Sequence, residues 1–334
     1  MIRDRTAART AFLALAGWGN ATCAVLADDA SFRKYFRLSR ADRSAVLMDA
    51  PPEHEDTAAF ARLARHLTGL GYSAPEILAE DHVHGFLLLE DLGDETYTRR
   101  LAAGADESAL YALAVDLLAD LHRRPAVNVL PSALVPPYDD ACLLAEARLL
   151  TDWYMPAVLD DAPDADAVAD YEARWRAAFP LARAVPDTLV LRDFHVDNLL
   201  QVAGRTGLAA CGLLDFQDAV AGPVTYDLVS LLEDARRDID PALVAAMTAR
   251  YRDAVPGLDP DAFAASWAVL AAQRHAKVIG IFTRLSRRDG KPRYLGHIPR
   301  VWRLMEAALA HPALSNVRAW IDCHIPPERR TAPP

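Results

Sequence analysis

The sequence predicts an α+β fold with two lobes: a small β-rich N-terminal lobe over residues 1–93 and a larger, mainly helical C-terminal lobe over residues 94–334. Its 334 residues, of which 52% are hydrophobic, are enough for more than one compact core. Strand patterns concentrate in the N-terminal part, whereas helical periodicity dominates from Glu107 onward. A short β-rich stretch interrupts the helical part, and it lies close in sequence to polar residues.

Local patterns predict the elements of the N-terminal lobe. An amphipathic helix covers the start of the chain and ends at Gly17 and Gly19. Residues 41–44 predict a hairpin turn between two strands, and Gly71 ends a segment with apolar residues at helical spacing. In chain order we expect strands at 31–38 and 45–48, a helix at 56–70, an extended segment at 74–79 and a buried strand at 85–90.

The C-terminal lobe is predicted to be helical except for one stretch. An amphipathic helix at 109–124 ends before Pro125, and a loop rich in Pro and Asp follows at 131–140. Helices then continue to about Phe179 and resume at Tyr226. Between them, apolar runs predict strands at 188–192, 198–202 and 207–215.

Composition excludes several classes of protein. The formal net charge is −10, which argues against a general binder of nucleic acid or of anionic membranes. The four cysteines form no CxxC pair, so neither a zinc ribbon nor a disulfide scaffold is expected. No stretch is apolar for the length that a bilayer requires. We therefore expect a cytoplasmic monomer that acts on a small molecule, without a nucleic-acid or membrane partner.

Residues 191–200 (LRDFHVDNLL) carry the strongest chemical signal. A strand runs into a polar loop and out into a second strand, and seventeen residues after Asn198 another apolar strand ends at Asp215. Phosphoryl transfer from ATP needs a carboxylate that orients and deprotonates the attacking hydroxyl, and oxygen ligands that hold Mg²⁺. Asp193 fits the base, and Asn198 and Asp215 fit the metal ligands. The alternative, that all three are turn and loop-capping residues, does not account for their combination with the flanking strands.

These segments resemble the aminoglycoside phosphotransferase and choline kinase-like branch of the protein-kinase-like fold. The resemblance extends over about residues 31–301. Residues 86–93 (FLLLEDLG) are similar to the hinge strand whose backbone takes up adenine, residues 191–200 to the catalytic loop, and residues 213–232 to the metal-binding segment. The resemblance implies a bilobal protein-kinase-like fold with ATP and Mg²⁺ as cofactors. It also implies the same roles for Asp193, Asn198 and Asp215.

A narrower resemblance concerns the acceptor. Segments such as SFRKYFRL, VLMDAPPEHED and, near the C-terminus, QRHAKVIGIFTRLSRRDGKPRYLGHIPRV resemble the bacterial anomeric kinases of N-acetylmuramate and N-acetylglucosamine. Those enzymes phosphorylate the C1 hydroxyl and produce sugar 1-phosphates for peptidoglycan recycling. The C-terminal match is the most specific, because this region varies most with the substrate.

The resemblance also implies which residues bind the nucleotide. Glu90 and Leu92 would supply hinge backbone groups for adenine. Ser31 and Phe32 lie where a loop would cover the phosphates, and backbone N–H groups there could contact phosphate oxygens.

The sequence departs from the family where a strand lysine should hold the α- and β-phosphates. Met48 occupies that position, and Phe60 stands where a helix should supply the glutamate partner of this lysine. The protein is therefore either inactive or uses a nearby cation, for which Arg33, Lys34 and Arg37 are the candidates.

Alternation along the strand decides among these cations. It places Arg33 and Arg37 on one face and Lys34 with Phe36 on the other. Because Phe36 is expected to face the core, we assign Arg33 and Arg37 to the phosphates, with Glu55 as an expected ion-pair partner of one of them.

Charge near the C-terminus bears on the acceptor. Residues 284–303 contain seven basic residues and one acid, a net charge of +6. A basic loop would suit an anionic sugar such as N-acetylmuramate, whose carboxylate matches the arginine fork. A solvated basic face is the alternative. The residues predicted to contact the sugar are His195, Gln217, Asp218, Arg274, Lys277, Lys291 and Arg293.

Three other residues have a competing structural role. Asp227 is expected to anchor the catalytic loop, for example through Arg192, rather than to touch substrate. Trp153 and Tyr154 could stack on a pyranose ring or belong to the core.

The sequence thus predicts ATP- and Mg²⁺-dependent phosphorylation of the anomeric C1 hydroxyl of N-acetylmuramate, N-acetylglucosamine or both. Two alternatives remain at this point. One is another small-molecule kinase of the same fold, acting on an aminoglycoside, choline or homoserine. The other is a non-catalytic nucleotide-binding regulator, suggested by Met48.

Overall fold

A computed structural model describes residues 5–27, 32–131, 134–159 and 163–334. The chain forms two compact units, and each consists of two segments. Unit 1 comprises Met1–Leu113 and Val196–Asp218, and unit 2 comprises Ala114–His195 and Ala219–Pro334. The chain therefore passes from unit 2 to unit 1 inside the polar loop that follows Asp193. The division at residue 93 that the sequence suggested stays a prediction.

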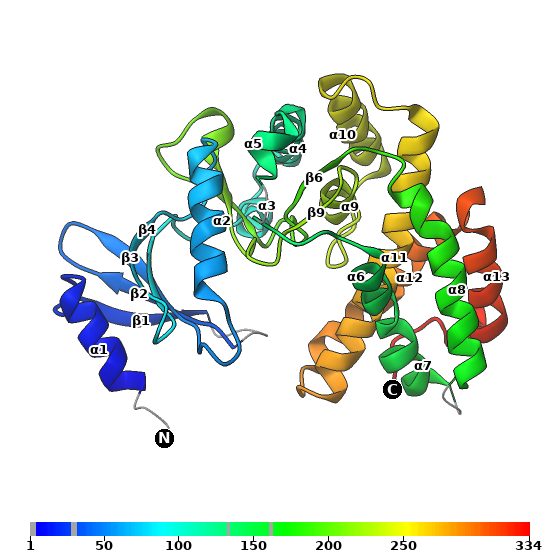
Figure 1. The fold of residues 1–334 in the computed structure, drawn as a ribbon, viewed down its shortest axis with the longest axis horizontal. Coiled ribbons are helices and arrows are strands. Elements are labelled where there is room, and N and C mark those ends of the chain that lie inside the picture. Colours follow the sequence, from blue (N-terminus) through cyan, green and yellow to red (C-terminus); the bar gives the residue numbers. More distant parts are fainter. Residues whose placement is uncertain (1–4, 28–31, 132–133, 160–162) are drawn as a thin grey trace. The chain divides into compact units, whose positions relative to one another are not determined.

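Unit 1 contains a five-stranded antiparallel sheet with the strand order β1-β2-β3-β5-β4 (Figure 1). Strand β5 is buried along most of its length because it pairs with β3 on one side and β4 on the other. The sequence patterns predicted every strand except β1, which forms one edge and pairs irregularly with β2. The strands are β1 (Thr22–Ala27), β2 (Lys34–Ser39), β3 (Ser44–Asp49), β4 (Ile77–Asp81) and β5 (Phe86–Glu90).

Two helices pack with this sheet. Helix α1 (Arg5–Leu15) buries Phe12 in a cluster with residues of β2, β3 and β5. Helix α2 (Thr57–Gly69) begins where the Asp56 carboxylate accepts hydrogen bonds from two backbone N–H groups, and it contacts β4. Phe36 packs against the α1 cluster, as the alternation along its strand predicted.

The remainder of unit 1 is a small β ladder that carries the end of the polar loop. Strand β7 (Leu199–Gln201) pairs antiparallel with β8 (Cys211–Leu213), and a 3₁₀ turn at Gly207–Ala210 lies between them. The strand expected at 207–215 is therefore shorter than predicted and starts only after this turn. Helix α3 (Tyr97–Ala102) contacts β7.

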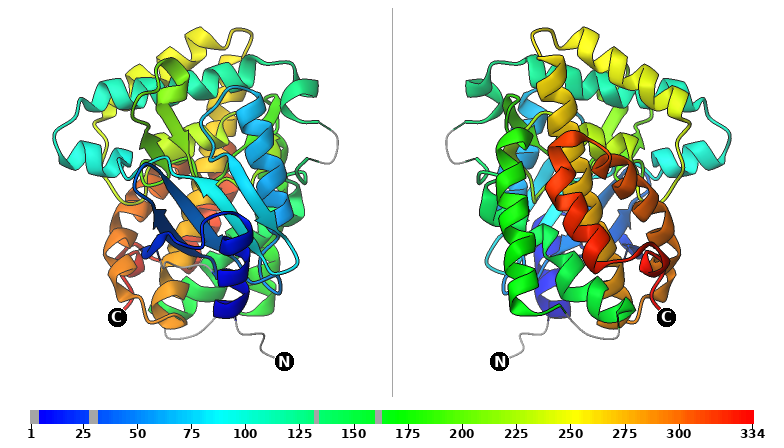
Figure 2. Two further views of the ribbon diagram at one scale, coloured as in Figure 1. Left: turned by 90° about the vertical axis from the view of Figure 1, so that its left-hand side faces the viewer. Right: turned by 90° about the vertical axis from the view of Figure 1, so that its right-hand side faces the viewer.

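Unit 2 is organised around one long buried helix, α11 (Pro260–Arg287), which contacts α6, α8, α9 and α12 (Figure 2). The hydrophobic core of unit 2 contains Trp175, Trp302 and Trp320. The other helices are α4 (Glu107–Arg123, which starts in unit 1), α5 (Ala126–Val129), α6 (Asp140–Ala147), α7 (Met155–Val158), α8 (Ala165–Ala182), α9 (Tyr226–Leu232), α10 (Pro241–Ala254), α12 (Ile298–Leu309) and α13 (Ser315–His324).

Short elements complete unit 2. Strands β6 (Asp187–Val190) and β9 (Val220–Pro223) pair antiparallel and flank the polar segment in the sequence. A π-helix at Leu150–Tyr154 and 3₁₀ turns at Pro292–His297, Pro312–Leu314 and Pro327–Arg329 connect the helices. The sequence patterns predicted neither β9 nor the π-helix.

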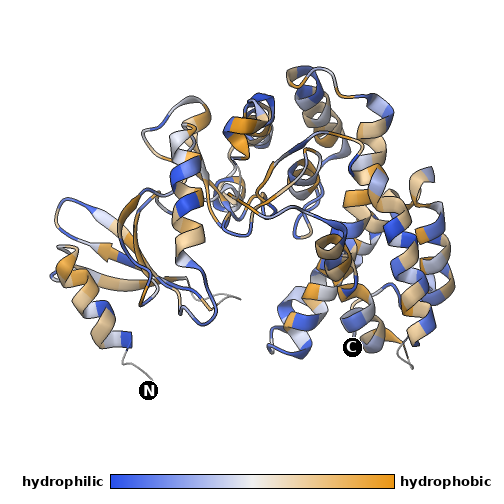
Figure 3. Cartoon of the chain, viewed as in Figure 1, coloured by the Kyte–Doolittle hydropathy of each residue, from blue (hydrophilic) through white to orange (hydrophobic). Residues whose placement is uncertain are grey.

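Hydropathy follows this architecture. Figure 3 shows mostly apolar strands in the sheet and mixed polar and apolar residues along the helices of unit 2. In the described part of the chain, no helix is both long enough and apolar enough to cross a bilayer.

Gly280 of α11 provides a test of this packing. A Cβ atom at this position would lie 2.2 Å from the carbonyl oxygen of Leu149, so Gly280→Ala forces backbone apart. We expect the free energy of unfolding to fall by about 1–3 kcal/mol, measured by denaturant titration. Gly69→Ala is the control, because a Cβ atom there meets nothing within 4 Å. Equal stability of the two variants would contradict the packing.

Candidate functional site

The segment after β6 is held by a buried carboxylate. Asp227, near the start of α9, accepts hydrogen bonds from the backbone N–H groups of Leu191 (2.7 Å) and Arg192 (2.9 Å). Burial raises the pKa of Asp227 to about 7, and the two N–H groups offset part of this rise. The expectation that Asp227 anchors the loop is confirmed, although it holds the backbone rather than the guanidinium of Arg192.

Two residues of the predicted site have left-handed backbone angles. Among the described residues, Arg192 (φ 68°) and Asp215 (φ 58°) are the non-glycine residues with positive φ. This conformation costs on the order of 1–3 kcal/mol and persists only where surrounding contacts enforce it. Such strain is concentrated at functional sites, so both positions support a functional role for these loops.

The guanidinium of Arg192 reaches a second buried acid, Glu146 of α6. Glu146 Oε1 accepts hydrogen bonds from Arg192 and from Lys277 (2.8 Å). Its Oε2 accepts from the hydroxyl of Tyr138 and from Gln273 (3.0 Å). Burial by itself would raise the pKa of Glu146, but Lys277 and Arg192 lower it to about 2. Glu146 therefore remains ionised and binds two cations of unit 2.

Asp193 follows Arg192 in this cationic environment. Burial alone would raise the pKa of Asp193, but the charges of Lys277 and Arg274 outweigh burial and hold this pKa below its usual value. Asp193 is therefore a carboxylate near neutral pH, which is the form that can accept a proton. The pKa of His195 is lowered, mainly by burial, so its imidazole is neutral there.

The two predicted metal ligands lie at the same end of the β7–β8 ladder in unit 1. The backbone carbonyl of Asn198 accepts a hydrogen bond from the N–H of Leu214 (2.9 Å), and Asp215 is the next residue. The structure thus brings together two residues that are 17 positions apart in the sequence. An amide oxygen and a carboxylate fit Mg²⁺, which takes one or two protein ligands besides substrate phosphates.

Arg33 is the cation beside this pair. Its guanidinium lies 3.1 Å from Asp215 Oδ1 and 3.6 Å from Glu55 Oε2, so the expected partnership with Glu55 is confirmed. Arg37, by contrast, bonds Asp91 (2.9 Å) and Asp94. Within unit 1, the structure therefore distinguishes two arginines that strand alternation had treated as equivalent.

Residues after Asp215 extend the polar cluster of unit 1. Gln217 donates hydrogen bonds to Asp215 (3.0 Å) and to Asp218 (3.1 Å), both predicted site residues. Gln217 thus connects the predicted metal ligand to Asp218, which is exposed. A contact of Gln217 or Asp218 with sugar stays a prediction.

The predicted hinge and phosphate loop are placed only in part. The N–H of Glu90 donates to the carbonyl of Glu76 (2.9 Å), so Glu90 would reach adenine through its carbonyl oxygen. Leu92 is buried in a small cluster beside β7. The Phe32 ring is 60% exposed and stacks on His54 at 4.0 Å between ring centroids. Ser31 lies outside the described residues.

The predicted sugar-binding cations have different environments. Arg274 and Lys277 are buried in α11, where Lys277 binds Glu146 and Arg274 lies over the Tyr226 ring. Lys291 lies just before the 3₁₀ turn that follows α11. Arg293 lies in this turn, and its guanidinium stacks on the ring of Tyr294. The helix does end before Gly290, as predicted.

Part of the basic charge at 284–303 is neutralised locally. Arg288 bonds Asp289 (2.7 Å), and Arg300 bonds Asp238 (2.8 Å), as does Arg303 (3.4 Å). These pairs reduce the charge that a ligand would experience.

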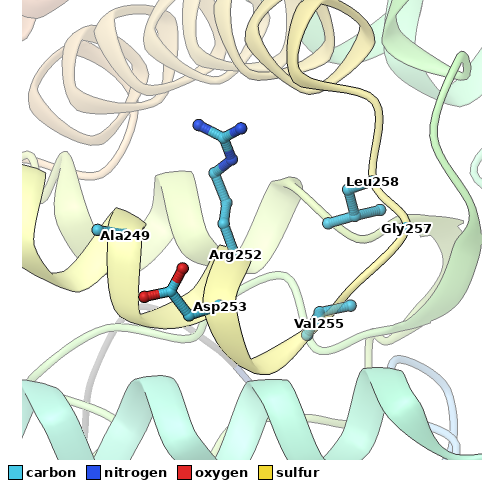
Figure 4. A pocket seen from close by; sticks show the side chains of 6 residues that line it. All are labelled: Ala249, Arg252, Asp253, Val255, Gly257 and Leu258. Atoms are coloured by element: carbon cyan, nitrogen blue, oxygen red, sulfur yellow. The ribbon is translucent and has the colours of Figure 1, made fainter.

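Each unit has a pocket lined by described residues. The pocket of unit 1 has a volume of about 370 Å³ and includes Glu55, the partner of Arg33. The pocket of unit 2 has a volume of about 290 Å³, lies where α10 ends and contains no predicted site residue (Figure 4). Its lining consists of Ala249, Arg252, Asp253, Val255, Gly257 and Leu258.

Sequence reasoning missed Glu146, and it left Tyr154 undecided. An acid flanked by leucine and alanine in LLAEARLL signals a buried charge, but the sequence does not show its partners. Tyr154 belongs to the core, and its hydroxyl donates to the carbonyl of Arg329 (2.6 Å).

The sequence of the chain is similar to those of known proteins. The Phosphotransferase enzyme family matches residues 22–265. The chain is 38% identical to an N-acetylmuramate/N-acetylglucosamine kinase of Caulobacter vibrioides, over 98% of both chains. It is 41% identical to a protein of the same name from Pseudomonas aeruginosa, over 90% of this chain and 89% of that one.

Solved structures show a similar fold. A choline/ethanolamine kinase family protein from Mesorhizobium loti superposes with a TM-score of 0.62 at 14% identity, covering 96% of this chain and 99% of that one. The GDP complex of aminoglycoside 2′-phosphotransferase-IIIa superposes with a TM-score of 0.59 at 15% identity, covering 92% and 99%. These neighbours confirm the predicted kinase-like fold.

The Glu146 cluster makes a prediction about stability. Glu146→Gln leaves Lys277 and Arg192 without their counter-charge, so we expect a loss of about 3–5 kcal/mol in the free energy of unfolding at pH 7. Glu172→Gln, which breaks pairs of Glu172 with two half-exposed arginines, should cost no more than about 1 kcal/mol.

The same variant has a defined pH dependence. The folded pKa of Glu146, about 2, lies below its ordinary value, so the unfolded chain takes up the proton first as the pH falls. The stability that Glu146 contributes is complete above its ordinary pKa and declines toward pH 2. Denaturant titrations at pH 6 and pH 3 should therefore show a smaller gap between wild type and Glu146→Gln at pH 3; a constant gap would contradict the assignment.

Proposed function

The chain belongs to the phosphotransferase enzyme family, and from this premise we propose that it is an ATP- and Mg²⁺-dependent kinase of N-acetylmuramate and N-acetylglucosamine. The products are ADP and the sugar 1-phosphate, formed by transfer to the anomeric C1 hydroxyl. The observation that carries the substrate class is the 38% identity, along 98% of both chains, to a relative with that name.

Asp193 is the proposed base. Its carboxylate accepts the proton of the C1 hydroxyl as the sugar oxygen attacks the γ-phosphorus and the bond to the β-phosphate oxygen breaks. A carboxylate with a lowered pKa is a weak base, which suits phosphoryl transfer because orientation matters more than early deprotonation. The anomeric hydroxyl also ionises more readily than other sugar hydroxyls, so less basicity is required.

Asn198 and Asp215 are the proposed ligands of Mg²⁺. When bound, the ion neutralises charge on the nucleotide phosphates. Arg33 is the proposed replacement for the strand lysine that Met48 displaces, because its guanidinium lies beside Asp215. Glu55 holds the other side of this guanidinium and so limits its rotation. Glu90 and Leu92 are proposed to bind adenine through their backbone.

A panel of acceptors tests the proposed function. We expect ADP release with N-acetylmuramate and N-acetylglucosamine but not with kanamycin, choline or homoserine, and the phosphate should appear on C1 by ³¹P NMR. Asp193→Asn should lower kcat by about 10²–10⁴-fold, because it removes the proton acceptor. Nucleotide binding by Asp193→Asn, measured by calorimetry, should be retained and shows that the variant is folded.

Two results of this panel would overturn the proposal. If ADP is released only with a polycationic aminoglycoside, the acceptor is an antibiotic and not an amino sugar of the proposed kind. Near-wild-type turnover by Asp193→Asn would remove Asp193 from the role of base.

The role of Arg33 is tested separately. Arg33→Gln removes the guanidinium beside Asp215, so we expect the KM for ATP to rise about tenfold or more while the KM for the sugar changes little. Lys34→Gln is the matched control, because Lys34 is exposed and points to the opposite face of β2. A rise in the KM for ATP with Lys34→Gln but not with Arg33→Gln would contradict the assignment.

A further inference from the structure

Three acidic side chains on α9 and just beyond it differ in how their oxygens are bonded. Asp227 uses both oxygens to hold the catalytic loop. Glu233 also uses both: Oε1 accepts from the Trp267 indole (2.6 Å), and Oε2 lies 2.7 Å from Nε2 of His275. These two acids therefore have complete structural roles. Asp234 does not.

Asp234 is 2% exposed, and its carboxylate is bonded on one side only. Its Oδ1 accepts a hydrogen bond from the backbone N–H of Arg236 (2.8 Å). Its Oδ2 is buried and has no hydrogen-bond partner. Among the described residues, this is the one carboxylate oxygen of which both statements hold. Nearly all buried polar atoms in native proteins are bonded, and a buried acceptor without a donor is costly. The oxygen therefore has the character of a position that a ligand completes.

Asp234 lies beside the catalytic loop within unit 2. Burial and Arg236 lower the pKa of His195, whereas the carboxylates of Asp234 and Asp193 both act on the same imidazole to raise it. The same two carboxylates act on the guanidinium of Arg274. The base and Asp234 thus share two neighbours.

One short helix, α9, relates the position of Asp234 to that of Asp193. Asp227, the second residue of α9, anchors the loop before Asp193, and Asp234 is the second residue after the last residue of this helix, Leu232. A rigid element of seven residues therefore sets the position of Asp234 relative to the base.

We propose that Asp234 Oδ2 accepts a hydrogen bond from a hydroxyl of the acceptor sugar other than the C1 hydroxyl, and that it thereby selects the acceptor. This role rests on the proposed function. A neutral hydroxyl fits better than an ammonium group, because the cations Arg236, Arg274 and Arg300 already act on this part of the unit. Sites built to bond a substrate hydroxyl reject analogues that lack it.

The test compares wild type with Asp234→Asn. Asparagine keeps an oxygen for the N–H of Arg236 but can present an N–H₂ donor where the sugar needs an acceptor. With N-acetylglucosamine we expect the KM for the sugar to rise roughly 10- to 100-fold, with the KM for ATP unchanged. Thermal unfolding of Asp234→Asn, measured by calorimetry, shows whether the variant is folded.

Deoxy sugars identify the hydroxyl. With the wild-type enzyme, one of the 3-, 4- and 6-deoxy analogues of N-acetylglucosamine should have a kcat/KM roughly 10- to 100-fold below that of the parent sugar. With Asp234→Asn, the same analogue and the parent sugar should have nearly equal kcat/KM. Asp238→Asn is the matched control: Asp238 is four residues further, exposed and paired with Arg300, so the KM for the sugar should not change.

The outcomes separate the two proposals. If the wild-type enzyme phosphorylates no amino sugar, the proposed function is wrong. If it does, but Asp234→Asn keeps the wild-type KM for the sugar, the role of Asp234 alone is wrong. Should Asp234→Asn fail to fold, the deoxy series with wild type decides: equal kcat/KM for all three analogues and the parent sugar would overturn the proposal.

Discussion

The catalytic loop depends on the carboxylate of Asp227, which holds the backbone N–H groups of Leu191 and Arg192. These two bonds stabilise a left-handed residue that would otherwise be unfavourable, since φ of Arg192 is 68°. The carbonyl of Arg192 is also bound, by the hydroxyl of Ser230 (3.2 Å), and its guanidinium binds Glu146. Because α9 holds both the N–H and the carbonyl of Arg192 and α6 holds its guanidinium, the direction in which the chain leaves toward Asp193 is determined before any substrate binds.

The charges around Asp193 are balanced within unit 2, and those around Asp215 within unit 1. In unit 2, Lys277 and Arg192 bind Glu146, and their field also keeps Asp193 ionised. Buried ion pairs of this kind contribute more to orientation than to net stability, because desolvation offsets most of the attraction. In unit 1, the guanidinium of Arg33 lies next to Asp215, and Met48 stands where the family resemblance places a strand lysine. Each unit therefore organises its own share of the proposed chemistry: the proposed base lies in unit 2, and the proposed metal ligands with Arg33 lie in unit 1.

Local signals in the sequence were sufficient for most elements and for the predicted reaction. Period-3.6 patterns, together with glycine and proline stops, located the principal helices. Period-two patterns located every strand of the five-stranded sheet except β1. The spacing of Asp193, Asn198 and Asp215 between apolar strands indicated phosphoryl transfer, because that reaction needs one base and two oxygen ligands. The departure at Met48 was also visible, and strand alternation narrowed the replacement to Arg33 or Arg37. Edge strand β1, strand β9 and the π-helix were missed because their patterns are short or weak.

What the sequence by itself determined, then, is the fold class, since local periodicity predicts the elements, and the family, since the motifs resemble those of its members. The roles of Asp193, Asn198 and Asp215 stay a prediction from motif spacing. Only the tertiary structure decided how charges are partnered, because a partner can lie on any element that packs nearby. It paired Arg33 rather than Arg37 with Asp215, and it buried Lys277 against Glu146. It also neutralised part of the basic run near the C-terminus with local acids, which weakens the sequence argument for an anionic acceptor. Finally, it distinguished Asp227, which holds the loop, and Glu233, which bonds Trp267 and His275, from Asp234, whose Oδ2 is buried without a hydrogen-bond partner.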